Sequence, residues 1–359
     1  MTEQAFFVGM DLGTFKTSVV SSSGNRDVVY TAVGWAKDHV ARAMLGREVV
    51  FGEDVFEQRL ALDVVRPFLK GALKYSDQAE AGLSEDSVAK HTEAARLIVE
   101  HAVSLVRPPF GAPIYGVIGA PSRASIESKK LIMEAARSAF DCVAIVPEPF
   151  TVAYGVGRLK DTLVVDIGAG TIDICPMFGT YPREQDQLTI PLGGDAVDER
   201  FYELMRTTFP DADLSLNMAR EIKEKHGFVH NVNEKALATL RVHGKPTQVD
   251  VTEPLKEACR MIVDPIIEGI RELVARFDPE FQQSLLKCVL LGGGGSQLNG
   301  LDHLIEEALE PYGGSNVRKV HDSVYAGACG ALKLAMGMPE EYWAQIRESA
   351  PDRMAAMTA

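Results

Sequence analysis

Two aspartates, Asp11 and Asp166, stand at matching places in the chain, each where an apolar run gives way to a glycine turn. The first lies in FFVGMDLGTFKTSVVSS, residues 6–22, and the second in TLVVDIGAGTIDICPMF, residues 162–178. Glycine lets the backbone approach a ligand closely, and successive N–H groups in such a turn bind phosphate oxygens. A carboxylate beside a phosphate needs a cation between them, and Mg²⁺ prefers a few carboxylates together with phosphate oxygens. Two such hairpins that face each other could clamp one Mg²⁺–nucleotide from both sides.

A third glycine turn, Gly292 to Gly295, follows an apolar run and precedes a helix that we expect to begin near Leu301. The start of that helix would add positive electrostatic potential, and the glycines would let a base or a pyrophosphate lie close to the backbone. A plain strand-to-helix turn rarely needs four consecutive glycines. The segment therefore favours a ligand-binding loop.

Two charged residues near these turns have both a structural and a functional interpretation. Glu148 precedes Pro149, which suits the first turn of a helix. Its carboxylate either stabilises the helix dipole or orients the water that attacks a γ-phosphate. Lys16 in the first hairpin is either a solvated turn lysine or a phosphate contact. The residues by themselves leave both questions open.

Other phosphate and catalytic motifs are missing from the sequence. There is no G-x-x-x-x-G-K-[ST] and no G-x-S-x-G, which excludes a P-loop and a nucleophile elbow. A dinucleotide-binding turn needs glycine or alanine where Asp173 stands, and it needs a helix where a strand is expected. His226 and His230 have a zinc-like spacing, but Gly227 intervenes and no third ligand is evident, so we expect no zinc site.

Composition restricts the class of protein. The chain has 359 residues, enough for two domains, and a formal net charge of −13, which argues against nucleic-acid binding. The five cysteines include no C-x-x-C pair and lie mostly in apolar runs, which is typical of reduced thiols in the cytoplasm. No secretory signal and no membrane-spanning run is found, so we expect a cytoplasmic protein without direct membrane insertion.

Short β-rich runs alternate with longer helical ones, which indicates an α/β fold. Apolar spacing predicts a helix over 86–107, a strand over 113–120 and a small-residue helix over 323–338. Residues 247–277 read as a short strand followed by one long helix. The two aspartate segments lie about 155 residues apart, and one such internal repeat indicates two similar domains rather than a solenoid.

In this order, five segments resemble the signature segments of the actin superfamily. They are residues 11–17, EPFTVAYG from 148, DIGAGTID from 166, GGGGSQLNG from 292 and SVYAGACGALKLA from 323. The length and the Asp-Leu-Gly-Thr and Glu-Pro motifs are similar to bacterial actins of the MreB type. Residues 37–73 and PEEYWAQI, 339–346, look closest to the magnetosome-associated branch of those actins.

This resemblance implies an α/β, actin-like ATPase fold with two ribonuclease-H-like domains that flank a nucleotide cleft. Each domain would carry a smaller subdomain. The first domain would comprise residues 1–155, with its subdomain at about 34–75. The second would comprise residues 156–335, with its subdomain at about 200–265. A helix at about 323–336 would pack back on the first domain, and residues 337–359 would form a tail.

The resemblance also implies a role for each candidate site residue. Asp11 would hold Mg²⁺ through water, Asp166 would assist on the metal side, and Glu148 would position the hydrolytic water. Lys16 does not stand at the spacing of the phosphate lysine of eukaryotic actin. The implied nucleotide contacts are Gly13, Thr14 and Lys16 at the phosphates, Gly168, Ala169 and Gly170 in the second clamp, Gly194 and Asp195 near the ribose, Lys223 and Glu224 at the nucleoside, and Gly293, Gly294 and Ser296 beside the adenosine.

The implied function is that of a cytoskeletal ATPase. It would hydrolyse ATP to ADP and phosphate, assemble into homopolymeric filaments with Mg²⁺–ATP, disassemble after hydrolysis, and position magnetosome organelles. Its partners would be further copies of itself and an acidic adaptor protein on the magnetosome vesicle. Two alternatives stay open: a sugar- or acetate-kinase-like phosphotransferase with the same ATPase core, and a division adaptor of the FtsA type. The adaptor would need a C-terminal membrane helix, and Pro351 interrupts the stretch where it would lie.

Overall fold

The computed structural model describes residues 5–68, 85–122, 126–230 and 234–349. The chain forms two compact units, which we call unit 1 and unit 2. Unit 1 comprises residues 1–120, 124–147 and 327–359, and unit 2 comprises residues 121–123 and 148–326. The end of the predicted small subdomain, 69–75, and the end of the predicted tail, including Pro351, lie outside the described residues.

Unit 1 contains a five-stranded mixed sheet. Its strands are β1 (Phe6–Leu12), β2 (Lys16–Ser21), β3 (Arg26–Tyr30), β7 (Ile114–Ala120) and β8 (Cys142–Pro147). They lie in the order β3-β2-β1-β7-β8, with antiparallel pairing from β1 through β3 and parallel pairing from β1 through β8. The central position of β1 explains its apolar sequence, because a central strand covered by helices is buried on both faces. The predicted strand over 113–120 is confirmed as β7.

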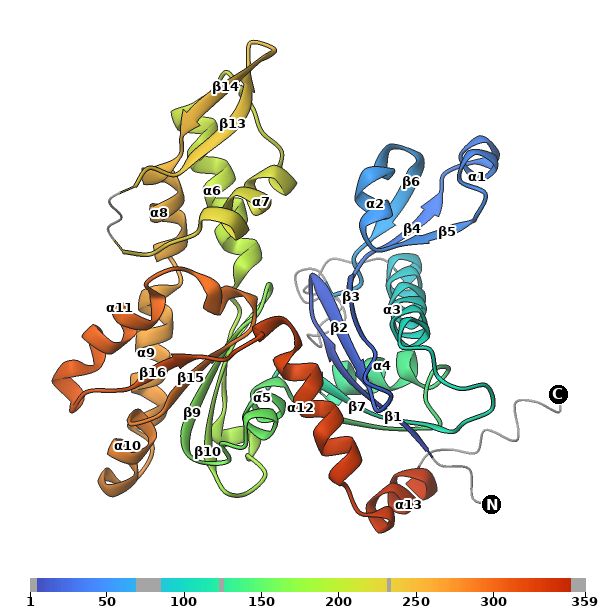
Figure 1. The fold of residues 1–359 in the computed structure, drawn as a ribbon, viewed down its shortest axis with the longest axis vertical. Helices are drawn as coiled ribbons and strands as arrows, with labels where there is room; N and C mark the ends of the chain where they lie inside the picture. The colour runs from blue at the N-terminus through green and yellow to red at the C-terminus, as the bar shows by residue number, and fades with distance from the viewer. Residues whose placement is uncertain (1–4, 69–84, 123–125, 231–233, 350–359) are drawn as a thin grey trace. The chain divides into compact units, whose positions relative to one another are not determined.

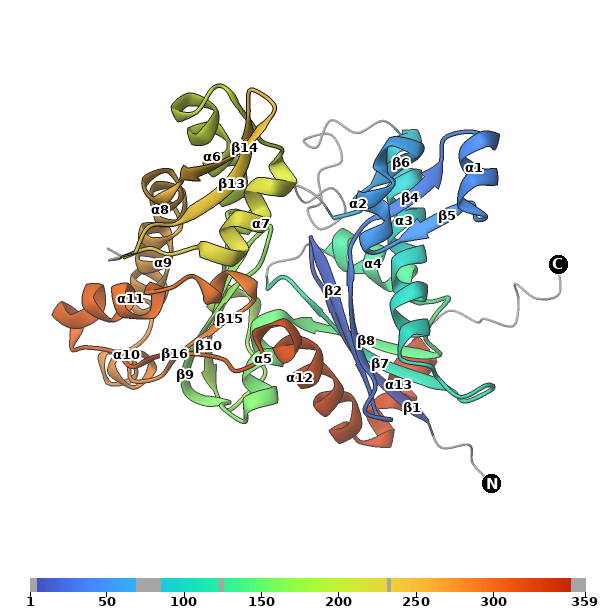
Figure 2. The ribbon, with the colours of Figure 1, turned by 45° about the horizontal axis from the view of Figure 1, so that its top comes forward.

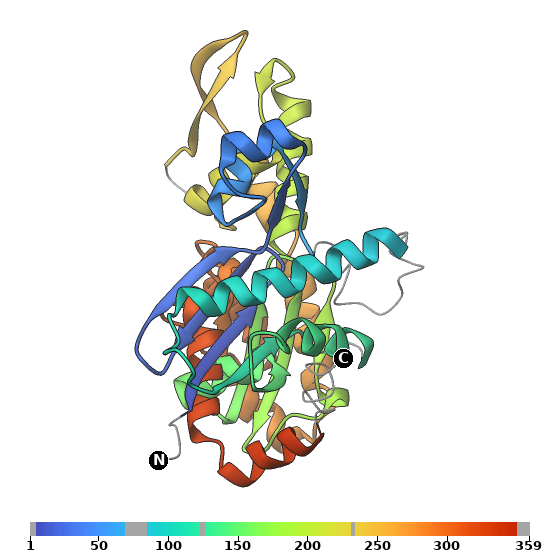
Figure 3. The ribbon, with the colours of Figure 1, turned by 90° about the vertical axis from the view of Figure 1, so that its right-hand side faces the viewer.

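Helices cover this sheet, and their buried side chains pack with those of the strands to form the apolar core of unit 1. They are α3 (Glu85–Leu105), α4 (Ile126–Ala136), most of α12 (Ser323–Gly337) and α13 (Glu340–Ser349). Figure 3 shows α3 along its length. The predicted small-residue helix is confirmed as α12. It lies directly on β1, because a Cβ added at Gly9 would come within 2.2 Å of the Ala328 carbonyl oxygen.

Unit 1 also carries a small three-stranded sheet. Its strands are β4 (Val33–Ala36), β5 (Val49–Phe51) and β6 (Leu62–Val65), in the order β5-β4-β6. The helices α1 (His39–Leu45) and α2 (Glu53–Glu57) and a 3-10 turn, η1 (Arg59–Ala61), connect them. Asp38 caps α1 by accepting a 2.8 Å hydrogen bond from the Ala41 amide, and Gly46 ends it with φ of 67°.

Unit 2 repeats the pattern of the larger sheet (Figure 1 and Figure 2). Its strands are β9 (Lys160–Ile167), β10 (Ile172–Phe178), β11 (Leu188–Ile190), β15 (Val289–Gly292) and β16 (Val317–Lys319). Their order is β11-β10-β9-β15-β16, again with antiparallel pairing on one side of the first strand and parallel pairing on the other. The two aspartate hairpins, β1–β2 and β9–β10, therefore occupy equivalent positions in two sheets of the same topology.

The remaining elements of unit 2 form its helical layers and a second small sheet, β12-β13-β14. The strands of this sheet are β12 (Ala212–Asp213), β13 (Leu237–Val242) and β14 (Lys245–Asp250). The helices are α5 (Glu148–Val156), α6 (Gly194–Thr208), α7 (Leu216–His226), α8 (Thr252–Arg260), α9 (Val263–Val274), α10 (Pro279–Leu286) and α11 (Leu301–Leu309), with 3-10 turns η3 (Glu184–Asp186), η4 (Gly294–Gln297) and η5 (Glu310–Tyr312). None of the described helices has both the length and the apolar character that a bilayer span requires.

The prediction of one long helix within 247–277 is wrong. The structure has two helices there, α8 and α9, separated at Met261 and Ile262. Pro265 explains the break, since it has no N–H to donate and its ring would clash with the carbonyl of Met261 in a continuous helix. A proline is tolerated in the first turn of a helix, which is where α9 places it.

Candidate nucleotide site

The first aspartate hairpin belongs to unit 1. Asp11 lies near the end of β1, opposite Ser18 of β2 and beside Gly119 of β7. Its carboxylate lies against Gly327 of α12, because a Cβ added at Gly327 would stand 2.7 Å from Asp11 Oδ2. The glycine in α12 thus makes room for the carboxylate at the mouth of the turn.

The turn between β1 and β2 is tight. A Cβ added at Gly13 would come within 2.3 Å of the Lys16 carbonyl oxygen, and Thr14 is buried. The Lys16 ammonium lies 5.6 Å from the ring centroid of Phe15 and 5.5 Å from that of Tyr30, which is cation–π geometry. In this structure the Lys16 ammonium therefore lies over aromatic rings of its own unit.

The second hairpin belongs to unit 2. Asp166 of β9 is 6% exposed and pairs in register with Asp173 of β10. The Gly168 amide donates to the Thr171 carbonyl at 2.8 Å and closes the turn that contains Ala169 and Gly170. The prediction that a strand follows this turn is confirmed by β10, and a helix at this point would have been needed for a dinucleotide fold.

The four-glycine segment lies against this hairpin. Gly292 pairs with Asp166 across β15 and β9, and a Cβ at Gly293 would stand 2.5 Å from Asp166 Oδ1. Gly293 also has φ of 71°, a conformation that favours glycine. Ser296 Oγ donates to the Gly293 carbonyl at 2.7 Å, whereas a Cβ at Gly294 would meet no atom within 4 Å. The predicted helix near Leu301 is confirmed as α11.

The start of α6 is tied to the second turn. The Gly194 amide donates to the Gly168 carbonyl at 3.0 Å, and the Asp195 amide donates to the Ala169 carbonyl at 2.8 Å. A Cβ at Gly193 would come 2.5 Å from the Ala169 oxygen. The structure therefore brings the predicted ribose residues directly beside the predicted second clamp.

Four charged side chains hold α7 on α6. Arg220 pairs with both Asp195 and Asp198 at 2.8 Å, and Lys223 Nζ lies 2.7 Å from Asp198 and donates to the Gly194 carbonyl at 3.1 Å. Burial raises the pKa of the Asp198 carboxyl, while Lys223 and Arg220 act in the opposite direction. Glu224, the next residue, is exposed. Lys223 thus has a structural partner close to the site predicted for it.

Glu148 is the first residue of α5, as its position before Pro149 predicts. Its carbonyl accepts a 2.7 Å hydrogen bond from Thr151 Oγ1. Two residues further on, the buried Phe150 ring packs 5.1 Å from that of Tyr181. These contacts fix the first turn of α5 and hence the backbone that carries Glu148.

Sequence reasoning assigned no role at the site to Asp173, which the structure shows to be a central support of the second turn. Asp173 is 1% exposed and accepts hydrogen bonds from the Ser122 amide at 2.9 Å, Thr171 Oγ1 at 3.0 Å and Thr189 Oγ1 at 2.5 Å. These donors compensate a charge that would be costly to bury alone. An acid inside the apolar run TIDICPMF is the sequence signal that could have identified it.

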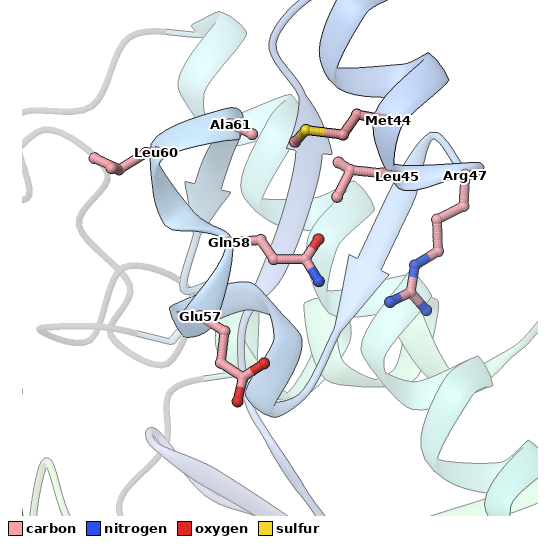
Figure 4. A pocket seen from close by; sticks show the side chains of 7 residues that line it. All are labelled: Met44, Leu45, Arg47, Glu57, Gln58, Leu60 and Ala61. Carbon is pink, nitrogen blue, oxygen red and sulfur yellow. The ribbon is translucent and has the colours of Figure 1, made fainter.

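Two hollows elsewhere contain none of the predicted site residues. One, of about 480 Å³, lies in the small sheet region of unit 1 (Figure 4). It is lined by Met44, Leu45, Arg47, Glu57, Gln58, Leu60 and Ala61. The other, of about 660 Å³, lies in unit 2 among α9, α10 and η5. In the described part of the chain, no group of three His, Cys, Asp or Glu side chains is arranged to hold a metal ion by itself.

Comparison with known proteins gives strong similarities over most of the chain. The sequence model of the MreB/Mbl protein family matches residues 5–336. The actin-like protein MamK of Paramagnetospirillum magneticum is 38% identical over 340 residues, which are 95% of this chain and 95% of that protein. MamK of Magnetospirillum gryphiswaldense is 37% identical over 340 residues, which are 95% of this chain and 91% of that protein.

Solved structures give the same result. A MamK double helical filament superposes with a TM-score of 0.87 at 39% identity and covers 94% of this chain and 100% of its own. A non-polymerising MamK mutant bound to AMPPNP superposes with a TM-score of 0.70 at 38% identity, covering 93% of this chain and 100% of its own. The fold is therefore actin-like.

Proposed function

Because this chain belongs to the MreB/Mbl family of actin-like proteins, we propose that it is an ATP hydrolase that assembles into filaments with Mg²⁺–ATP. Hydrolysis within the filament would then weaken the contacts between subunits, since polymerisation and nucleotide state are thermodynamically linked. The observation that carries the proposal is the packing of the Asp166 carboxylate against Gly293. At this point the end of β9, the turn from Gly168 to Gly170 and the four-glycine segment lie together.

We propose Asp11 and Asp166 as the residues that would hold a magnesium ion. Asp11 and Asp166 each stand at a strand end beside a glycine turn, and each has a glycine of another element packed against its carboxylate. Mg²⁺ retains several waters and accepts one or two carboxylates with phosphate oxygens, so these two residues would hold it through water. The ion would supply charge neutralisation between the acids and the phosphates.

The remaining predicted residues would bind the nucleotide. Gly13, Thr14 and the turn from Gly168 to Gly170 would offer amides to phosphate oxygens. Lys16 would add a phosphate contact only by leaving the Phe15 and Tyr30 rings. The proposed contacts to ribose, nucleoside and adenosine are Gly194, Asp195, Lys223, Glu224, Gly293, Gly294 and Ser296.

Glu148 would position the water that attacks the γ-phosphate. Phosphoryl transfer depends mainly on positioning and on charge stabilisation, so a carboxylate on a fixed helix start suits this task. The anchoring of α5 through Phe150 and Thr151 supports this role.

Filaments of this chain would act in the cytoplasm and would organise or position magnetosomes along their chains. The similarity to MamK proteins supports this proposal. The partners would be other copies of the chain and an acidic adaptor on the magnetosome vesicle, with neither nucleic acid nor the membrane itself as a direct partner.

Electron microscopy and phosphate release, each with ATP, with ADP and without nucleotide, test the proposal together. We expect filaments and phosphate release with Mg²⁺–ATP, and disassembly as ADP accumulates. Soluble monomers under all three conditions, with phosphate transferred to a sugar or to acetate, would instead establish a kinase of the same fold.

A further inference from the structure

Phe110 has the highest exposed fraction of any large apolar side chain in the described part of the chain, at 108%. It lies in the turn between α3 and β7 of unit 1, within the segment Arg107-Pro108-Pro109-Phe110. Covering this ring would remove its whole apolar surface from water, which would favour binding of a partner at this turn.

The turn that carries Phe110 is well defined. The Ala112 amide donates to the Pro109 carbonyl at 3.2 Å, and Gly111 has φ of 79°, as the third residue of a type II turn requires. Upstream, Asn25 Nδ2 donates to the Val106 carbonyl at 3.2 Å and fixes the end of α3. A ring presented by a fixed turn loses little conformational entropy on binding, which is the property of an interface anchor.

A hollow that fits an aromatic ring exists in unit 2. The groove of about 660 Å³ among α9, α10 and η5 is hereafter called the α9–α10 groove. Apolar side chains, Val274, Leu286 and Leu309, contribute to its lining. The Tyr312 ring also lines it, with the Arg271 guanidinium 4.8 Å from the ring centroid. The groove is large enough for one side chain and is open to solvent.

The charges of the two surfaces are complementary. Arg107 is exposed three residues before Phe110, and the sequence has no acid between Glu100 and Glu127. Glu268 and Glu272 line the groove together with Arg271, and Glu268 is exposed, whereas Glu272 already pairs with Arg276 at 2.5 Å. In a chain with a net charge of −13, copies repel one another, so a contact that joins a local cation to local acids is favoured.

We propose that Phe110 docks in the α9–α10 groove of a second copy of this chain, with Arg107 placed beside Glu268. The proposal rests on the filament assembly proposed above and assigns one of its contacts. Anchor and groove are different surfaces, so the contact is heterologous and can repeat from copy to copy.

Sedimentation of Phe110→Ser with Mg²⁺–ATP tests the anchor, with Phe110→Tyr as the matched control. We expect the concentration needed for assembly to rise at least about tenfold in Phe110→Ser and to stay near the wild-type value in Phe110→Tyr. The Phe110 side chain is exposed, so the unfolding temperature should stay unchanged in both variants. Assembly of Phe110→Ser at the wild-type concentration would overturn the proposal.

A charge exchange tests the groove as the occupied site. Arg107→Glu should weaken assembly, and Arg107→Glu combined with Glu268→Arg should restore it. Failure of the double variant to recover any assembly, with both variants folded, would show that Arg107 does not meet Glu268.

Cross-linking separates this contact from the filament proposal. The variant Pro109→Cys/Gln283→Cys keeps Phe110 and Arg107 and places one cysteine beside the exposed ring. Treated with a short bismaleimide at high protein concentration, it should give linked dimers and higher species, because Gln283 lines the groove. The wild type and the two variants with one added cysteine are the controls, since the five native cysteines include the exposed Cys329, and none of them should give this ladder. If the wild type forms no filaments but the double variant is linked between chains, the filament proposal fails and the contact stands. Filaments without such linkage would overturn the contact alone.

Discussion

The carboxylate of Asp166 and the backbone of Gly293 are in such close contact that a side chain at position 293 would displace one of them. An added Cβ would stand 2.5 Å from Asp166 Oδ1 and 2.4 Å from the Ile167 carbonyl oxygen, and Gly293 has positive φ. Gly294, one residue further, has open space where its Cβ would be. The glycines of the loop thus serve different purposes, one to accommodate an acid and one to leave the loop surface open.

We expect Gly293→Ala to lower the unfolding temperature by several degrees and to reduce ATP hydrolysis at least about tenfold, because Asp166 must move. Gly294→Ala should keep the unfolding temperature of the wild type. Its nucleotide affinity should fall if an adenosine lies over the loop. Differential scanning fluorimetry and titration with a fluorescent ATP analogue measure both effects, and equal unfolding temperatures for the two variants would contradict this assignment.

The contact between Asp11 and Gly327 predicts a coupling between two substitutions. Gly327→Ala would place a Cβ 2.7 Å from Asp11 Oδ2 and should destabilise the protein by about 1–3 kcal/mol. In an Asp11→Ala background the carboxylate is absent, so the same substitution should cost much less. Denaturant unfolding of the four proteins without nucleotide gives the coupling free energy. Additive effects of the two substitutions would show that this carboxylate does not lie against α12.

Most of the strands and helices that could be predicted follow from local sequence patterns, namely apolar spacing and glycine turns. The apolar runs that end at Asp11 and Asp166 are confirmed as strands, because strand ends are marked within a few residues by the glycine turns. The break between α8 and α9 was missed because apolar spacing continues through it, although Pro265 was visible in the sequence. The periodicity of apolar residues does not show that Pro265 lacks the N–H that a continuous helix needs at that position.

Contacts between distant segments could not be predicted in the same way. The Lys223 ammonium meets Asp198, which lies on another helix, and spacing within α7 gives no sign of it. From the sequence, Lys223 could therefore be interpreted only as a charged residue on a helix surface or as a nucleoside contact. Asp173 depends on the Ser122 amide from a separate loop, a contact that only the folded chain brings about. The roles of the predicted nucleotide contacts stay predictions, for which the variants described here are the test.

Changing Glu148 to Ala should separate assembly from hydrolysis. If the carboxylate only positions water, Glu148→Ala should still form filaments with ATP, release phosphate at least about 100-fold more slowly and disassemble late. Phosphate release and light scattering, recorded on the same sample, report the two steps. Phosphate release at the wild-type rate would remove Glu148 from the reaction.

Stability should fall in mild acid because of His101. Its ring stacks on Phe51 with centroids 4.2 Å apart, and burial lowers its pKa, with Asp27 and Arg47 acting in opposite directions. In the unfolded chain the pKa is about 6.5, so below that pH the unfolded state binds the proton first and the folded state loses stability. Well above pH 6.5, where the ring is neutral in both the folded and the unfolded state, this residue should contribute no pH dependence. Unfolding temperatures between pH 5 and 8 should therefore decline less steeply in His101→Gln, and identical slopes would exclude the effect.

Lys223 has two possible roles, and a second substitution can separate them. Its ammonium and the Arg220 guanidinium balance Asp195 and Asp198, of which Asp198 has a fully buried side chain. Lys223→Met would leave Arg220 as the remaining cation for both carboxylates and would remove one charged hydrogen bond from Asp198, so it should cost about 1.5–3 kcal/mol. Adding Asp198→Asn restores the balance, since Arg220 and Asp195 still pair, and should recover much of that loss. ATP binding to the stable double variant then reports the nucleoside contact alone: weakened affinity means that Lys223 also touches the nucleotide, whereas wild-type affinity means that its function is to hold α7 on α6.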